Sequence, residues 1–181
     1  MKLLPVLIFI AGGISGLIQA SEIVEPIVLK DNQVVIQVKG VVCSFCAYGT
    51  EKNLSKLSFL DSSYFDGDGV LLDIHTHRIT LALDKSKLVD FAAVNNAIVK
   101  GGYDPVTYYV RVHGQVEENN GTYELTSPHN NQVYHLQGQQ LATLSQSQGV
   151  YVEGKITVDS IAELTVGQPV SLFVDSTKEG K

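Results

Sequence analysis

Two cysteines, Cys43 and Cys46, are the residues of this 181-residue chain whose type and spacing are best suited to chemistry. They are its only thiols, and Ser44 and Phe45 separate them. A thiolate pair at this spacing holds a soft cation such as Cu(I), Zn(II) or Hg(II), or exchanges electrons as a dithiol and disulfide. A structural disulfide here would close a very small loop and stabilise the fold little. Metal binding is therefore the first hypothesis.

Two other hypotheses use the same segment differently. In the first, the chain is an exported thiol–disulfide redox protein or sensor. A thioredoxin-type site usually follows a tryptophan and carries Gly-Pro between its cysteines, whereas this chain has no tryptophan and carries Ser-Phe. In the second, the pair is vestigial and the chain is an adaptor whose C-terminal part binds a partner.

The elements around the cysteines predict how the pair is presented. Residues 34–39 (VVIQVK) are β-branched and partly alternating, which indicates a strand that Gly40 ends. Ser44 can cap a helix that continues to about Leu57. The thiols then lie at a strand-to-helix junction, where the helix start favours the thiolate form.

The next segments predict the fold of the first part of the chain. Strands are expected at 70–74, 79–83 and 106–112, and a helix at 87–100. The order is then β-α-β-β-α-β, the ferredoxin-like arrangement. In this arrangement the cysteine loop, the 75–77 turn and the 101–105 segment share one end of the sheet.

The last third of the chain has a different pattern. Residues 117–121 (EENNG) are polar and contain a glycine, and the segment 115–121 is interpreted as a linker. Four short strands follow within residues 122–175, which indicates a small all-β barrel or sandwich. Residues 176–181 are interpreted as a polar tail. The predicted fold class is therefore α+β, a ferredoxin-like domain followed by a small all-β domain.

The stretch GVVCSFC before a predicted helix, with Gly102-Tyr103 before the last strand of the first domain, resembles the heavy-metal-associated domain family. The resemblance covers residues 32–114. It implies that Cys43 and Cys46 bind one soft metal ion. A membrane metal transporter or efflux component is the partner expected for the C-terminal β domain, which the resemblance does not cover. Val41 stands where the family usually has Met, which leaves the identity of the metal open.

The N-terminus predicts export. Residues 1–20 combine Lys2, an apolar run and Gln19-Ala20, the pattern of a signal peptide cut after Ala20. Residues 21–31 then form an N-terminal segment, and no later stretch is apolar and long enough to span a membrane. The expected location is periplasmic or secreted.

The five histidines and Tyr103 are the remaining candidates for residues of the metal site. His75 and His77 fall near the same sheet end as the thiols and are interpreted as solvated turn residues rather than ligands. Tyr103 is expected either to pack beside the metal loop or to lie in the core. His113, His129 and His135 are interpreted as surface residues.

Composition and motifs exclude other classes of function. The net charge of −6 and the absence of a basic cluster argue against nucleic acid. No arrangement of a nucleophile and a base is visible, so no enzymatic activity is expected. Residues 66–69 (DGDG) lack the downstream glutamate of a calcium loop and are interpreted as a turn.

Overall fold

The computed structural model describes residues 26–40, 44–139, 141–144, 149–162 and 164–179. Strand β1 (Gln33–Gly40) lies between β3 (Arg78–Ala82) and β4 (Tyr103–Asn119), and β2 (Val70–Asp73) forms the outer edge next to β3. All of these pairs are antiparallel. The β-branched residues predicted to form the first strand therefore occupy the middle of this part of the sheet.

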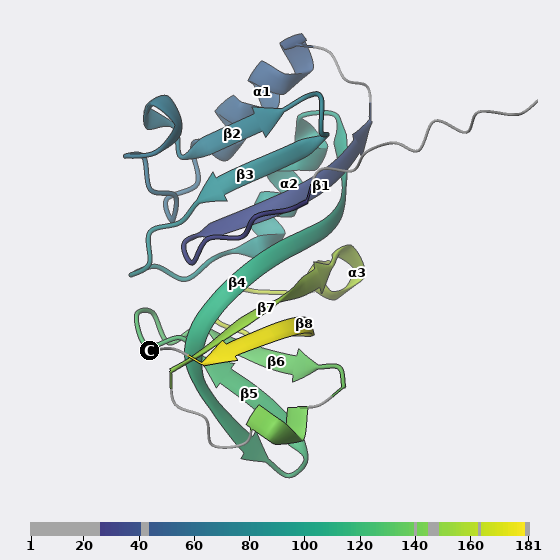
Figure 1. The fold of residues 1–181 in the computed structure, drawn as a ribbon. Helices are drawn as coiled ribbons and strands as arrows, with labels where there is room; N and C mark the ends of the chain where they lie inside the picture. The colour runs from purple at the N-terminus through teal and green to yellow at the C-terminus, as the bar shows by residue number, and fades with distance from the viewer. Residues whose placement is uncertain (1–25, 41–43, 140, 145–148, 163, 180–181) are drawn as a thin grey trace, which may run out of the picture.

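Two helices cover one face of these strands, and residues 26–30 run across the other face (Figure 1). Helix α1 (Ser44–Leu54) follows β1, and helix α2 (Phe91–Lys100) follows β3. The short 3-10 helix η1 (Phe65–Gly67) lies in the loop before β2. Helix α2 begins later than predicted because the Asp90 side chain caps it, accepting a hydrogen bond from the Ala93 amide at 2.8 Å.

Strand β4 continues into a closed barrel (Figure 1). The barrel also contains β5 (Thr122–Thr126), β6 (Val133–Gln137), β7 (Val150–Thr157) and β8 (Val170–Glu179). Its order is β4-β5-β6-β8-β7, and a β4–β7 pairing closes it. The pair β6–β8 is parallel, and this order is the topology of the OB fold. Between these strands lie the 3-10 helix η2 (Leu141–Leu144) and the short helix α3 (Val158–Ile161).

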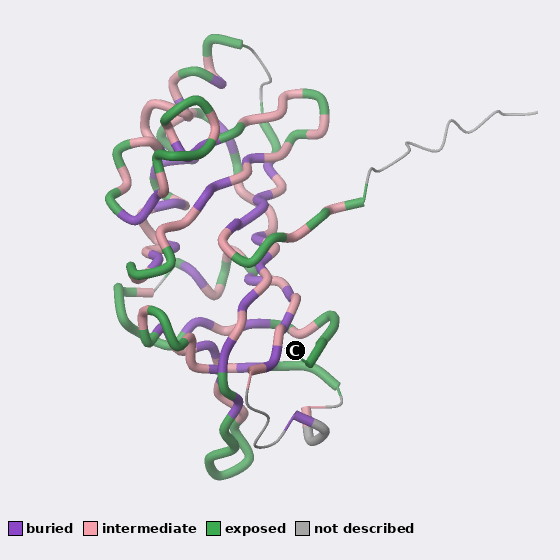
Figure 2. The backbone as a smooth tube through the Cα atoms, turned by 60° about the vertical axis from the view of Figure 1, so that its left-hand side comes forward, coloured by how far each residue is buried: buried purple, intermediate pink, exposed green. Residues whose placement is uncertain are grey.

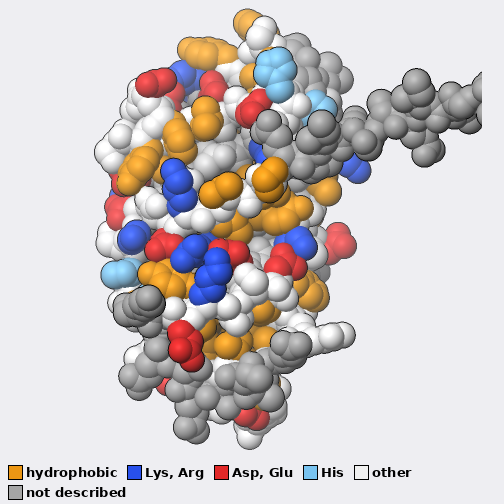
Figure 3. Space-filling model, viewed as in Figure 1, with side chains coloured by type: hydrophobic (Ala, Val, Ile, Leu, Met, Phe, Trp, Pro, Cys, Tyr) orange, Lys and Arg blue, Asp and Glu red, His pale blue; other side chains and the backbone are white. Residues whose placement is uncertain are grey.

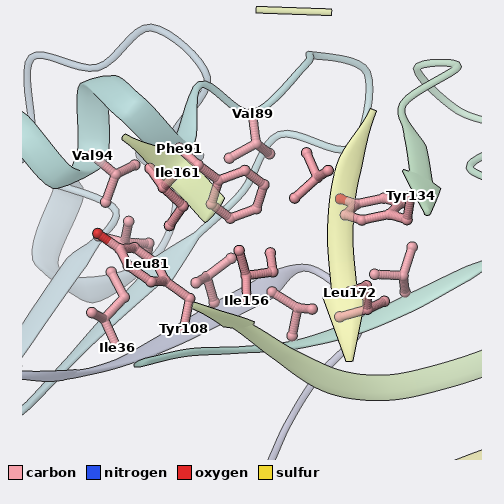
Figure 4. Close-up of a cluster of buried hydrophobic side chains, with 14 of the residues drawn as sticks. Ile36, Leu81, Val89, Phe91, Val94, Tyr108, Tyr134, Ile156, Ile161 and Leu172 are labelled. Carbon is pink, nitrogen blue, oxygen red and sulfur yellow. The ribbon is translucent and has the colours of Figure 1, made fainter. Parts of the chain in front are cut away.

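One hydrophobic core runs through both parts of the molecule. Figure 4 shows Ile36 and Phe91 from the helical part in the same cluster as Ile156 and Leu172 from the barrel. The rings of Phe91 and Tyr108 meet edge to face, with centroids 6.1 Å apart. In Figure 2 the buried stretches follow the strands through the waist, the region where β4 passes from the helical part into the barrel.

The predicted fold class, a ferredoxin-like domain followed by a separate small β domain, is wrong. Over the residues that the structure describes, the protein is mostly β, with few helices and a closed five-stranded barrel, and these strands form one continuous eight-stranded sheet. The physical reason lies in β4, where burial alternates from Tyr108 to Val116 without a break. At Gly114 this strand approaches the end of β5 so closely that a Cβ atom would collide with the Thr126 carbonyl oxygen.

Two segment boundaries also differ from the sequence-based expectation. Residues 115–119, expected in a linker, form the end of β4 and pair with β5, and residues 120–121 make the turn between them. Residues 176–179, expected in a polar tail, belong to β8 and pair with β7. The predicted signal peptide, residues 1–20, lies outside the described residues. Among the helices that the structure describes, none has the length and apolar character to cross a membrane.

Candidate metal site

The strand that leads to the cysteines ends at Gly40, as predicted. Gly40 has a φ of +130°, a conformation that side chains strongly disfavour. It pairs with Tyr103 in the sheet, and a Cβ atom here would lie 3.0 Å from the Gly102 carbonyl oxygen. Glycine is therefore required for β1 to end against the start of β4.

Of the two predicted metal ligands, the structure describes Cys46 but not Cys43. Cys46 is the third residue of α1, in its first turn, and is half-buried. It packs against the hydrophobic core. Cys43 lies outside the described residues, so its position relative to Cys46 stays a prediction.

Helix α1 is positioned by a short stripe of buried residues. Ala47, Thr50 and Leu54 are buried, and their spacing places them on one face of the helix. Thr50 lies against Gly101, just after α2, where a Cβ atom would collide with the Thr50 hydroxyl oxygen. The close approach at Gly101 therefore fixes the helix that carries Cys46.

Two of the predicted neighbouring loops reach the same end of the sheet as Cys46. The Val38 amide donates a hydrogen bond to the His77 carbonyl at 3.0 Å, which holds the 75–77 turn beside the end of β1. The imidazoles of His75 and His77 are both exposed. Tyr103 is 2% exposed and belongs to the core, while its backbone pairs with Gly40. The core position expected for Tyr103 is confirmed, whereas its packing beside the metal loop stays a prediction because residues 41–43 lie outside the described residues.

The turn beside the site is held by Asp73. Its carboxylate accepts hydrogen bonds from the amides of His75 and Thr76 at 2.8 and 3.3 Å. The Thr76 side chain, followed by the His75 amide, lowers the pKa of Asp73 below its ordinary value. The ionised carboxylate therefore stabilises this turn.

Sequence reasoning missed the exposed aromatic residues of α1. Phe45 is 85% exposed and Tyr48 is 59% exposed, and both lie on the helix that carries Cys46. Lys52 lies over the Tyr48 ring at 5.7 Å from its centroid and pairs with Asp68 at 2.9 Å. The available signal was that both aromatic residues fall outside the stripe formed by Ala47, Thr50 and Leu54.

The remaining histidines lie away from these residues. His135 contacts Glu124 at 2.9 Å across β5 and β6, and the His113 ring packs against Tyr151 with centroids 4.6 Å apart. Within the described part of the chain, no three His, Cys, Asp or Glu side chains form a group that could hold a metal. The described residues thus supply one thiol of the predicted pair and no third ligand.

Residues 66–69 form the turn predicted for them.

Comparison with known proteins gives one slight structural likeness. No family model matches the sequence, and no curated protein matches it. The structure is similar to one described as the water soluble region of P-type ATPase CopA from Bacillus subtilis, with a TM-score of 0.36 and 20% identity. The match covers 52% of this chain and 56% of that chain, so the chain spans little more than half of that structure. At this TM-score the likeness carries no argument, and the resemblance seen in the sequence stays a prediction.

Proposed function

We propose that this protein is not an enzyme but a binding protein that carries one soft metal ion, Cu(I), Hg(II) or Zn(II), between the thiolates of Cys43 and Cys46. The observation that carries the proposal is the place of Cys46, half-buried in the first turn of α1. Amide groups at a helix start lack partners within the helix, and with the helix dipole they favour a thiolate. Soft thiolates in turn select soft cations.

Sequestration and transfer both follow from a site with only two thiolates. A thiolate of another protein can add to such an ion and displace one of the original ligands, so that the ion moves without being released. The exposed rings of Phe45 and Tyr48 belong to the same helix as Cys46 and offer an apolar contact for that protein. We propose a membrane metal transporter or efflux component as the recipient and an exported, periplasmic or secreted, location for the exchange.

Metal analysis of the reduced chain without residues 1–20 tests the proposal. The protein is offered Cu(I), Zn(II) and Hg(II) in competition under anaerobic conditions. We expect one bound ion per chain, lost in Cys43→Ser and in Cys46→Ser. Ser62→Ala is the control, because Ser62 is an exposed loop residue outside the cysteine segment and its replacement should keep the ion.

Two results would overturn the proposal. One is the absence of stoichiometric metal in the reduced wild-type chain. The other is a bound ion that both cysteine variants retain. Thiol–disulfide exchange faster than that of a model dithiol, in a chain that binds no metal, would assign the pair to redox chemistry instead.

A further inference from the structure

A cavity of about 100 Å³ lies where the helical part of the molecule meets the barrel, and Cys46 is not among the residues that line it. Its walls come from five parts of the chain, namely the turn before β1, the loop from β3 to α2, the middle of β4, the turn from β5 to β6, and the beginning of β7. In Figure 3, Lys and Arg side chains gather at the left of the waist beside acidic side chains and a histidine.

The walls are held together by hydrogen bonds between these segments. The Leu83 amide donates to the Asn32 carbonyl at 2.8 Å. The side chain of Asn130 donates to the Lys87 carbonyl at 2.8 Å, which fixes the β5–β6 turn against the loop before α2. The cavity is therefore formed in advance, and a ligand would not have to order these segments.

Arg111 is the fixed cation of the cavity. Its guanidinium lies 2.8 Å from the Asp31 carboxylate and 3.4 Å from that of Glu153, and it stacks 4.6 Å from the centroid of the Tyr151 ring. The His113 ring packs against the same tyrosine. These contacts hold a planar donor group in one orientation, as recognition of a planar anion requires.

Two lysines add positive charge beside Arg111. Lys87 is tied to the Ser58 carbonyl at 2.6 Å and to Asp84 at 3.2 Å. Lys85 is exposed and has no ion-pair partner among the residues that the structure describes. Its ammonium group is therefore available to a ligand.

The balance of charge indicates the sign of that ligand. The whole chain carries 13 Lys and Arg against 19 Asp and Glu. The cavity does not share this excess, because its lining has three Lys and Arg residues against Asp31 and Asp84, with Glu153 outside the lining as a further partner of Arg111. Lys85 is the cation of this lining that no carboxylate of the described residues pairs, and its ammonium group favours an anion.

We propose that this cavity binds a small organic acid through its carboxylate, with Lys85 and Arg111 as the recognising groups. The volume suits a molecule of a few heavy atoms. The lining holds only one more basic Lys or Arg than it holds acids, which favours a singly charged carboxylate over a multiply charged phosphate.

Chemical-shift titration of the reduced, metal-free chain tests this site. Acetate, lactate and inorganic phosphate are added separately at constant ionic strength. We expect acetate or lactate to shift the resonances of His113 and Tyr151 saturably. The dissociation constant should rise about tenfold in Lys85→Gln, the loss expected for one charged hydrogen bond. Lys100→Gln, an exposed lysine at the end of α2, is the matched control and should bind like the wild type.

A loss of affinity in Lys85→Gln can be distinguished from a loss of folding, because Lys85 is exposed and its replacement should not disturb the fold. A thermal melt of the variant checks this. The absence of saturable shifts overturns the proposal, and so does equal affinity in Lys85→Gln and Lys100→Gln. Phosphate that binds more tightly than both carboxylates overturns the assigned ligand class.

Discussion

At the scale of single residues, replacing two glycines close in sequence to the cysteines should change the free energy of unfolding in opposite directions. Gly40→Ala should destabilise the fold by about 1 to 3 kcal/mol, because a side chain at its φ of +130° is strained and meets the Gly102 carbonyl. Gly49, inside α1, has open space around its Cα, so Gly49→Ala should stabilise by about 0.5 to 1 kcal/mol. Urea unfolding measures both changes. Equal effects of the two substitutions would contradict the assigned role of Gly40.

Asp73 should make the turn beside the candidate site sensitive to acid. Because hydrogen bonds from the turn lower the pKa of Asp73, its carboxylate contributes stability that is complete above the unfolded-state pKa of about 4. That contribution is lost as the pH falls through the lower pKa of the folded state. The difference in unfolding free energy between wild type and Asp73→Asn should thus be largest near about pH 6 and shrink below about pH 4. A difference that grows towards low pH would have the wrong sign.

At the scale of elements, the contact between α1 and the end of α2 is limited by Gly101. Its φ of −79° suits any residue, so Gly101→Ala probes the contact with Thr50 alone. We expect a loss of about 1 to 3 kcal/mol from overpacking. Thr50→Ala removes the colliding hydroxyl, so adding Gly101→Ala to that variant should cost less than it does in the wild type. Additive effects in this double-mutant cycle would show that the two positions do not touch.

The turn between β5 and β6 is joined to the start of α2 by Gln132. This side chain is 3% exposed, and its Oε1 accepts a hydrogen bond from the Val89 amide at 2.9 Å. Gln132→Ala leaves that buried amide unpaired and should cost about 1 to 3 kcal/mol. Gln137→Ala, at an exposed position of β6, is the control and should change stability by less than about 0.5 kcal/mol. Similar melting temperatures for both variants would argue against this link.

The helices and strands differ in how well the sequence predicted their bounds. Alternation predicted β1 close to its observed bounds, the capping residue predicted the start of α1, and the pattern of 122–175 predicted four short strands where β5, β6, β7 and the first part of β8 lie. The ends of β4 and β8 could not be predicted, because their pairing uses backbone hydrogen bonds and places no demand on the polar side chains of 117–119 and 176–179. The waist cavity could not be predicted either. Asp31, Lys85, Arg111 and Tyr151 are far apart in the sequence and meet only through the sheet topology.

At the scale of the whole molecule, β4 decides whether the two parts can fold separately. Residues 107–114 of β4 pair with β7, and Tyr108, which is fully buried, shares its core with Ile156 and Ile161 of the barrel part. A chain that ends at residue 114 would expose that core and leave β4 without this partner. We therefore expect residues 21–114 alone to lose cooperative thermal unfolding.

Circular dichroism and size-exclusion chromatography measure this outcome. The control is a chain of residues 21–179, which keeps β8 complete. Its melting temperature should equal that of residues 21–181. The predicted boundary after residue 114 requires the opposite result, a compact fragment with a cooperative melt close to that of the control. The shared core favours loss of folding, because removing the barrel takes away one side of the cluster that surrounds Tyr108.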